Sequence, residues 1–147
     1  MELSQDFKEF VQLLNVHKVE YLIVGGYAVA FHGFPRTTGD IDFWVKPFPE
    51  NAERLMKALV DFGFGSVDLS KDDFLKKDHV IQLGFPPNRI DIMTSVSGVE
   101  FDECWKEKEE INFEGEKINF ISLHYLKINK EKTGRDKDKI DLKNLPK

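Results

Sequence analysis

The chain has 147 residues, of which 41% are hydrophobic, and its 21 basic and 26 acidic side chains give a net charge of -5. This length and apolar content suit a globular unit with its own core, so residues 1–147 are expected to form a single domain. The acidic balance excludes a broad basic surface for duplex DNA or anionic membranes, because non-specific affinity for either comes from clustered Lys and Arg.

Two features of the sequence predict a cytoplasmic protein that does not associate with membranes. The lone Cys104 has no partner for an internal disulfide, and the first residues lack the basic segment and apolar run of a secretory signal. The most apolar stretch, Tyr21 to Phe31, is interrupted by glycines and is shorter than the roughly 20 residues that span a bilayer.

Segments of helical and strand periodicity alternate in the first half of the chain. Ser4 is a predicted N-cap because apolar residues recur behind it at helical spacing. In chain order we expect a helix from Ser4 to about Val16, a strand at Tyr21–Val24, a short helix at Tyr27–His32, a strand at Asp40–Val45, a helix from about Asn51 to Gly63 or Gly65, and a helical turn near Asp72–Lys76.

The second half of the chain contains two predicted hairpins and two further helices. Pro86-Pro87-Asn88 and Glu114-Gly115-Glu116 have turn chemistry between apolar runs. The expected elements are strands Val80–Phe85 and Arg89–Met93, a short helix within Glu100–Glu110, strands Glu110–Phe113 and Lys117–Ile121, a helix from Ser122 to about Lys132, and a last helix from about Asp136 to Leu145. Interleaved strands and helices predict an α+β fold, a mixed β-sheet flanked by helices.

Asp40 and Asp42 are separated by one apolar residue at the start of a predicted strand, so their side chains point to the same face. Two carboxylates a few ångströms apart repel each other unless a cation joins them, which indicates a metal site. Asp91, flanked by isoleucines in a later predicted strand, is a third candidate ligand. If the two strands are neighbours, three carboxylates converge and can hold two Mg²⁺ ions.

Gly25-Gly26 separates an apolar strand from a short helix. Glycines let the backbone approach an anion, and the helix that follows offers free N–H donors, so a triphosphate would fit there. Taken alone, such a pair is also common in plain turns. Its combination with the acidic pair favours the phosphate-binding interpretation.

Gly25-Gly26, thirteen further residues, Asp40-Ile41-Asp42 and the later strand residue Asp91 together resemble the nucleotidyltransferase superfamily that includes DNA polymerase β. Within it, the chain is most similar to the small bacterial AbiEii-like and MenT-like nucleotidyltransferases, several of which are toxins of toxin–antitoxin pairs. Two patterns carry this closer likeness, Arg36-x-Thr38-x-Asp40-x-Asp42 and the tail that runs from Lys130 through Gly134-Arg135-x-Lys137-Asp138 to Asp141-Leu142.

The resemblance implies a minimal nucleotidyltransferase fold whose Asp40 and Asp42 bind Mg²⁺, most simply two ions, with Mn²⁺ as a substitute. It implies that Asp91 binds metal or takes the proton of the acceptor, and that Gly25 and Gly26 hold phosphates. The other implied nucleotide-binding residues are Arg36, Thr38, Lys130 and Arg135. Many members have Ser after the first glycine, so Gly26 is a departure that leaves only backbone donors.

Several of these residues also have a structural interpretation. Asp91 alternatively pairs with Arg89 on its own strand face, and Arg36 with a carboxylate of its loop. Lys130 and Arg135 alternatively form a solvated helix face, the usual position of a charge run. The two acidic residues of the tail are expected to organise Arg135 or cap structure rather than to catalyse: Asp138 and Asp141.

The predicted activity is Mg²⁺-dependent transfer of a nucleoside monophosphate from an NTP to a hydroxyl or phosphate acceptor, with release of pyrophosphate, an EC 2.7.7-type reaction. The alternative from another class is a non-catalytic nucleotide- or partner-binding module with the same fold. A third hypothesis is a small-molecule or antibiotic-modifying transferase. The sequence leaves the acceptor open among RNA, protein and small molecules, and leaves a partner protein open as well.

Overall fold

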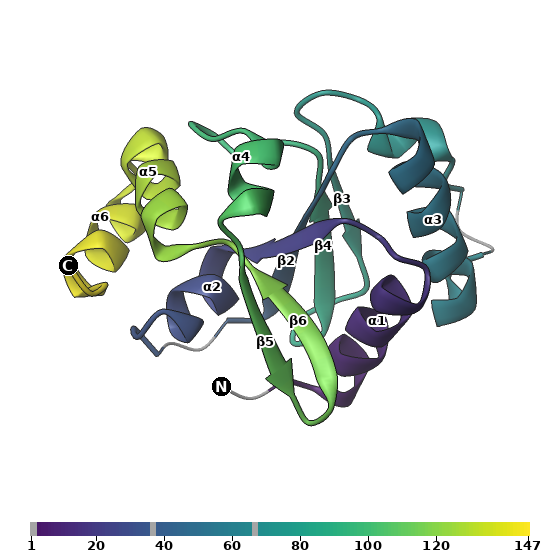
Figure 1. Cartoon of the computed structure of the whole chain (residues 1–147), viewed down its shortest axis with the longest axis horizontal. Helices are drawn as coiled ribbons and strands as arrows, with labels where there is room; N and C mark the ends of the chain where they lie inside the picture. The colour runs from purple at the N-terminus through teal and green to yellow at the C-terminus, as the bar shows by residue number, and fades with distance from the viewer. Residues whose placement is uncertain (1–2, 36–37, 66–67) are drawn as a thin grey trace.

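The computed structural model describes residues 3–35, 38–65 and 68–147 (Figure 1). Its helices are α1 (Gln5–Val16), α2 (Gly25–Phe31), α3 (Pro49–Leu59), α4 (Phe101–Lys106), α5 (Leu123–Thr133) and α6 (Asp136–Asn144), with a π-helical turn at Val60–Phe64 and a 3-10 turn at Lys71–Phe74. Its strands are β1 (Tyr21–Val24), β2 (Asp40–Val45), β3 (Val80–Leu83), β4 (Arg89–Met93), β5 (Glu109–Phe113) and β6 (Glu116–Phe120). The predicted α+β class is confirmed.

The strands form one sheet in the order β3-β4-β2-β1-β6-β5. The central strand β2 is antiparallel to β1 and parallel to β4. The predicted hairpins β3–β4 and β5–β6 are antiparallel pairs, whereas β1 and β6 are parallel, so the sheet is mixed. Consequently the two strands that carry the predicted carboxylates are neighbours, with the same direction, near the middle of the sheet.

Side-chain alternation along β2 separates the two faces of the sheet. Phe43 packs against Phe10 of α1, with ring centroids 5.1 Å apart, and the next residue, Trp44, packs against Phe101 of α4 at the same distance. Helices α1 and α4 therefore cover opposite faces. Asp40 and Asp42 alternate with Phe43, so they lie on the face of Trp44, away from the apolar core beneath α1 and α3.

The predicted N-cap at Ser4 is present, and Ser122 caps the start of α5 in the same way. The Ser4 hydroxyl accepts a hydrogen bond from the backbone N–H of Phe7, and the Ser122 hydroxyl accepts one from Tyr125. Such caps satisfy amides that the first helical turn leaves without partners. Gly134 ends α5 in a left-handed conformation, with φ of 60°, and lets the chain turn back into α6.

Several boundaries differ from those expected. Strand β3 ends at Leu83 rather than Phe85, and β6 spans Glu116–Phe120 rather than Lys117–Ile121. Gly25 and Gly26 are the first residues of α2 rather than a separate turn before it, because Gly25 takes a φ of 68° at the strand-to-helix junction. Helix α3 begins at Pro49, two residues earlier than expected, because a proline without an N–H is well suited to a first helical turn.

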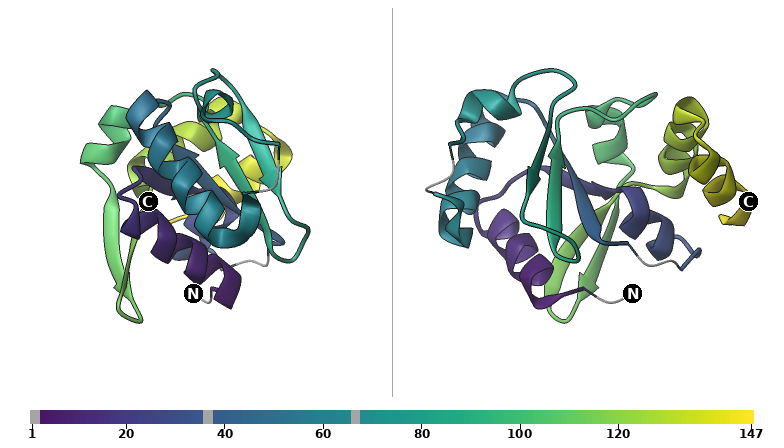
Figure 2. Two further views of the ribbon diagram at one scale, coloured as in Figure 1. Left: turned by 90° about the vertical axis from the view of Figure 1, so that its right-hand side faces the viewer. Right: turned by 180° about the vertical axis from the view of Figure 1, so that it is seen from behind.

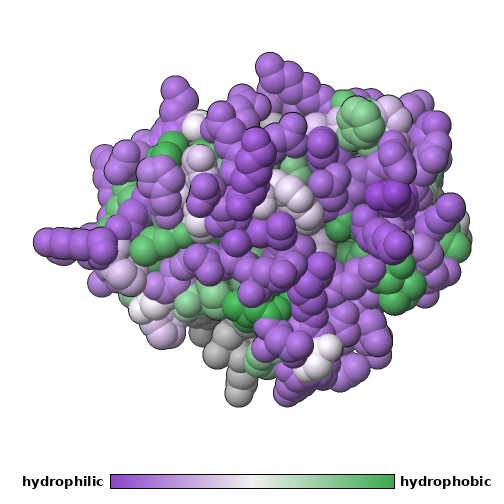
Figure 3. All heavy atoms as spheres, viewed as in Figure 1, coloured by the Kyte–Doolittle hydropathy of each residue, from purple (hydrophilic) through white to green (hydrophobic). Residues whose placement is uncertain are grey.

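Helices α5 and α6 lie together at one end of the molecule, and α1 and α3 lie at the other (Figures 1 and 2). The face in Figure 3 is largely hydrophilic, with hydrophobic residues in separate small patches. Within the part of the chain that the structure describes, no helix is both long and apolar enough to cross a membrane.

Candidate active site

The three predicted carboxylates converge on one face of the sheet. The parallel pairing of β2 and β4 places Asp42 opposite Asp91, and Asp40 opposite Arg89. Because side chains directly opposite in a sheet share a face, one ligand atom from each carboxylate lies within 4.8 Å of the others. The sequence predicted converging carboxylates on condition that these two strands are neighbours, and β2 and β4 are neighbours.

Asp42 lies at the centre of this cluster. Burial, followed by the negative charges of Asp40 and Asp91, raises its pKa to about 7. A positive charge brought next to such a carboxyl group lowers its pKa and favours the ionised form. The cluster thus has the electrostatic character of a cation-binding site.

Gly25 makes room for Asp42 as well as for the turn of the chain. A Cβ atom at Gly25 would lie 2.0 Å from Oδ2 of Asp42, and the φ of 68° is one that side chains disfavour. Gly25 and Asp40 are fifteen positions apart in the sequence. The glycine pair and the acidic pair are nevertheless in direct contact, through Gly25 and Asp42. Thr38 supports the same cluster, since its hydroxyl lies 3.2 Å from a carboxylate oxygen of Asp40.

Arg89 is a positive side chain within the acidic cluster. Its Nε and Nη2 donate to the two oxygens of Asp91 at 2.8 and 3.0 Å, and Nη2 also lies 3.5 Å from Asp40. The hydrogen bonds that Arg89 donates to Asp91 raise the pKa of Arg89, which keeps the guanidinium charged. The alternative expected for Asp91, a pair with Arg89, thus coexists with its place in the cluster.

A cleft of about 760 Å³ opens above the carboxylates. Its lining includes all of the predicted site residues that the structure describes, namely Gly25, Gly26, Thr38, Asp40, Asp42, Asp91, Lys130 and Arg135. Arg36 lies outside the described residues. The cleft is therefore bounded by the acidic strands and the glycine pair on one side and by the turn between α5 and α6 on the other.

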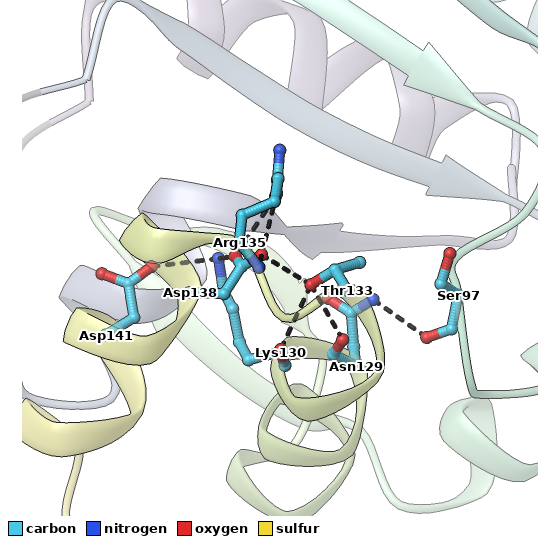
Figure 4. A network of polar contacts seen from close by, with 7 residues as sticks. All are labelled: Ser97, Asn129, Lys130, Thr133, Arg135, Asp138 and Asp141. Carbon is cyan, nitrogen blue, oxygen red and sulfur yellow. Dashed lines mark hydrogen bonds and ion pairs between the residues drawn. The ribbon is translucent and has the colours of Figure 1, made fainter.

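The α5–α6 wall is built on a buried ion network (Figure 4). Lys130 is only 3% exposed, and its Nζ lies 3.1 Å from Asp138 and 3.0 Å from Asp141, both of which are fully buried. Arg135 and Thr133 also donate to Asp138, at 2.8 and 2.7 Å. Lys130 is thus part of the interior rather than of a solvated helix face.

Asp138 holds the turn in shape. Its carboxylate accepts the backbone N–H of Arg135 at 3.1 Å, which caps the start of α6, as expected for an organising residue. Burial alone would raise the pKa of Asp138, but hydrogen bonds from Arg135, Thr133 and Lys130 outweigh it, and the pKa lies well below its usual range. The Arg135 side chain, 57% exposed, is left facing solvent at the cleft.

The residues present fit a divalent metal. Asp40, Asp42 and Asp91 offer only carboxylate oxygens, the donor type that Mg²⁺ and Mn²⁺ prefer. Three carboxylates share the guanidinium of Arg89, so the cluster keeps a net negative charge that a divalent ion can balance.

Some residues of the cleft were not singled out from the sequence. Lys137 lines it next to Arg135, although the tail pattern already contained that lysine. Ser95, Val96 and Ser97 line it after β4, and no sequence pattern marks them. Their position depends on a tertiary contact, the hydrogen bond that the Asn129 side chain donates to the Ser97 carbonyl at 3.0 Å.

A six-stranded mixed sheet with a three-carboxylate cluster beside a glycine-led helix is the arrangement of a nucleotidyltransferase. The family comparison agrees. A family model described as nucleotidyltransferases of unknown function (DUF6036) matches residues 1–145, and the chain belongs to this family. The superfamily inferred from the sequence is therefore confirmed. No curated protein matches the chain significantly in sequence.

Solved structures share the fold at low sequence identity. TM1012, a nucleotidyltransferase candidate from Thermotoga maritima, is 20% identical, with a TM-score of 0.62 over 93% of this chain and 88% of its own. The lincosamide antibiotic adenylyltransferase LnuA, bound to lincomycin, is 18% identical, with a TM-score of 0.58 over 97% and 95%. An antigenic nucleotidyltransferase-like protein from Paracoccidioides brasiliensis is 20% identical, with a TM-score of 0.54 over 97% and 75%.

Proposed function

We propose that this chain is a Mg²⁺-dependent nucleotidyltransferase that moves a nucleoside monophosphate from an NTP to a hydroxyl or phosphate acceptor and releases pyrophosphate. The observation that carries the proposal is the convergence of three carboxylates within 4.8 Å at the base of a cleft whose facing wall is basic. The reaction places a polyphosphate between these two charged surfaces, which an electroneutral cleft would bind weakly.

In this proposal Asp40, Asp42 and Asp91 hold the metal, most simply as two ions, with Mn²⁺ able to replace Mg²⁺. When bound, such ions neutralise phosphate charge and stabilise the charge that develops during phosphoryl transfer. Both oxygens of Asp91 already accept hydrogen bonds from Arg89, so Asp91 is better suited to hold a cation than to take the acceptor's proton.

Phosphate contacts are assigned to the remaining cleft residues. The backbone of Gly25 and Gly26 borders the cleft beside the carboxylates, and Thr38 and Arg36 belong to the same loop in the sequence. On the facing wall, the exposed Arg135 reaches the nucleotide directly, and Lys130 acts from beneath through the buried network that positions Arg135. Catalysis then comes chiefly from positioning and from preorganised charge.

The decisive variant is Asp42→Ala, which removes the central ligand. We expect it to abolish Mg²⁺-dependent ATP binding in calorimetry and transfer from α-³²P-labelled NTPs to components of a cell extract. Asp72→Ala, which removes an exposed carboxylate that does not line the cleft, is the matched control and should behave as the wild type. Undiminished transfer by Asp42→Ala contradicts the proposal.

The second candidate is a non-catalytic module that binds a nucleotide or a partner protein. The observation that favours it is Arg89, which neutralises part of the cluster without any metal. Calorimetry with ATP separates the two functions. The enzyme requires that ATP affinity depend on Mg²⁺ and that Asp40→Asn weaken it, whereas the non-catalytic module binds ATP equally with and without Mg²⁺.

Finer assignments also remain proposals. The likeness to AbiEii-like and MenT-like proteins, and with it a toxin–antitoxin role and a partner protein, depends on the Arg36-to-Asp42 and Lys130-to-Leu142 sequence patterns. We propose that the whole chain is one domain, because a single sheet receives strands from both halves of it. LnuA is an antibiotic adenylyltransferase with the same fold, which makes a small-molecule acceptor worth testing first.

A further inference from the structure

A second cleft, of about 650 Å³, adjoins the catalytic cleft. The three residues from Ser95 to Ser97 line both clefts, so this short segment is the wall between them. The volume is within the range of pockets that hold small molecules, roughly 300–1,000 Å³. The second cleft is therefore close enough to the carboxylates for its occupant to reach a nucleotide in the first.

The floor of the second cleft continues the floor of the first. Trp44 lies two residues beyond Asp42 on the same face of β2, about 7 Å along the strand, and it lines the second cleft. Phe101 packs edge-on against Trp44 and is stacked on Trp105, at centroid distances of 5.1 and 5.7 Å. Aromatic side chains thus form the inner end of the cleft, a surface suited to a ring or another apolar body.

The two clefts differ in charge. The catalytic cleft carries Lys130, Arg135 and Lys137 on the wall that faces its carboxylates. The charged residues in the lining of the second cleft are Lys77, Asp78 and Glu100, with a net charge of -1. Phosphates are therefore directed to the first cleft, and the second is suited to a neutral or cationic molecule rather than to a nucleic acid.

The dividing wall is held in place from both sides. The Ser95 hydroxyl donates to Asp78 at 2.6 Å, and the Ser97 carbonyl accepts from Asn129 of α5 at 3.0 Å (Figure 4). The Thr94 hydroxyl, just before the wall, donates to the Lys76 carbonyl at 2.6 Å. A wall fixed in this way leaves little ordering to be done when a ligand binds.

We propose that the second cleft is the acceptor subsite, and that the acceptor is a small neutral or cationic molecule with an apolar body and a free hydroxyl. The inference rests on the nucleotidyltransferase function proposed above and names its acceptor class. The hydroxyl oxygen forms a bond to the α-phosphorus of the NTP, the bond from that phosphorus to the bridging oxygen of the β-phosphate breaks, and pyrophosphate leaves with that electron pair. The hydroxyl proton is released to solvent.

The test uses the full-length chain with Mg²⁺, α-³²P-ATP and a cell extract separated into RNA, protein and a fraction below about 1 kDa. We expect label in the small-molecule fraction. Val99→Trp, which fills the second cleft, should lower that labelling at least tenfold. Glu100→Trp repeats the test from an exposed position that does not touch the core, and Val16→Trp, an exposed site on α1, is the matched control.

Calorimetry with Mg²⁺ and ATP separates the possible failures. All three tryptophan variants should bind ATP within about twofold of the wild type, which shows that they are folded and that the catalytic cleft is intact. Label in RNA or protein, or wild-type labelling by both Val99→Trp and Glu100→Trp, overturns the acceptor subsite and leaves the transferase function standing. Mg²⁺-dependent ATP binding without label in any fraction overturns both.

Discussion

The acidic cluster on the sheet and the ion network of α5–α6 contain the same kinds of side chain and differ in how completely their charges are balanced. Asp138 lies among Lys130, Arg135 and Thr133, and its pKa is lowered. Asp42 is buried beside two other carboxylates, and burial followed by their negative charges raises its pKa to about 7. The charges of the α5–α6 network are balanced within the protein, whereas the acidic cluster is balanced only in part by Arg89 and can accept an added cation.

This difference separates structural from functional charge. A buried carboxylate with several donors stabilises a turn, and it leaves little for a substrate to add. A buried carboxylate beside others destabilises the free protein and gives binding energy back when a cation arrives. The two clusters should therefore respond in opposite directions when charge is removed from them.

The largest effect is expected from Lys130→Met, which leaves Asp138 and Asp141 buried with one cation fewer. We expect a loss of about 4 kcal/mol in the free energy of unfolding, because removing one partner of a buried ion pair leaves uncompensated charge. Urea unfolding measures it. Lys137→Met, at an exposed lysine of the same wall, should change stability by no more than about 0.5 kcal/mol.

Asp42→Asn should have the opposite sign and a somewhat smaller size. The folded pKa of about 7 is above the ordinary value of 3.8, so the group stabilises the fold at low pH and that stability is lost as pH rises through 7. At pH 8 in EDTA the variant should therefore be more stable than the wild type by about 3 kcal/mol.

Urea unfolding of Asp42→Asn and the wild type at a second pH provides the control. At pH 5 its advantage in urea unfolding should shrink to well under half, since the wild-type carboxyl is then protonated in the folded state. Added Mg²⁺ should stabilise only the wild type. A variant that is less stable than the wild type at pH 8 contradicts the charge imbalance inferred for the cluster.

Gly25→Ala tests the contact between the glycine pair and the cluster. The new Cβ would lie 2.0 Å from Asp42 Oδ2 and would sit at a φ of 68°, so we expect a loss of about 2 kcal/mol and weaker Mg²⁺ binding in calorimetry. Gly63→Ala has a positive φ as well, with nothing near its Cβ, and should lose stability without any change in metal affinity. Equal metal affinity in both variants would count against the contact.

The smallest effect is expected from Gly98→Ala, which acts on the α5–α6 wall from outside. Its Cβ would lie 2.8 Å from the Cβ of Lys132, so α5 must shift slightly, at a cost of about 1 kcal/mol. ATP affinity should fall a few-fold while Mg²⁺ affinity without nucleotide stays the same. Gly115→Ala has almost the same φ and open space around it, and it should leave both affinities unchanged.

Local patterns predicted most of the fold. The period of apolar residues located the helices and strands, and the alternation along β2 placed Asp40 and Asp42 on one face before any tertiary contact was known. The sequence did not define the order of the strands, because pairing between β2 and β4 depends on the whole sheet. The sequence could therefore place Asp91 in the cluster only if the two strands pair, and the register of β2 and β4 shows that they do.

The parts of the site that escaped prediction are those that depend on distant contacts. The Lys130-to-Asp141 segment has the composition of a solvated charge run, yet its helices fold so that three of these charges are buried together. The contact of Gly25 with Asp42 and the reach of Arg89 to Asp40 both follow from cross-strand register. The second cleft has no signal in the sequence, since its dividing wall is fixed by side chains from three separate segments.

The parallel pairing of β2 with β4 has a consequence for how the protein folds. The chain must travel through α3 and β3 before Asp91 can meet Asp42, and such non-local contacts form slowly because loop closure costs entropy before any contact repays it. We expect metal affinity to develop late in refolding, together with the centre of the sheet. A nascent chain that has not yet completed β4 carries the glycines and two aspartates and still lacks the site.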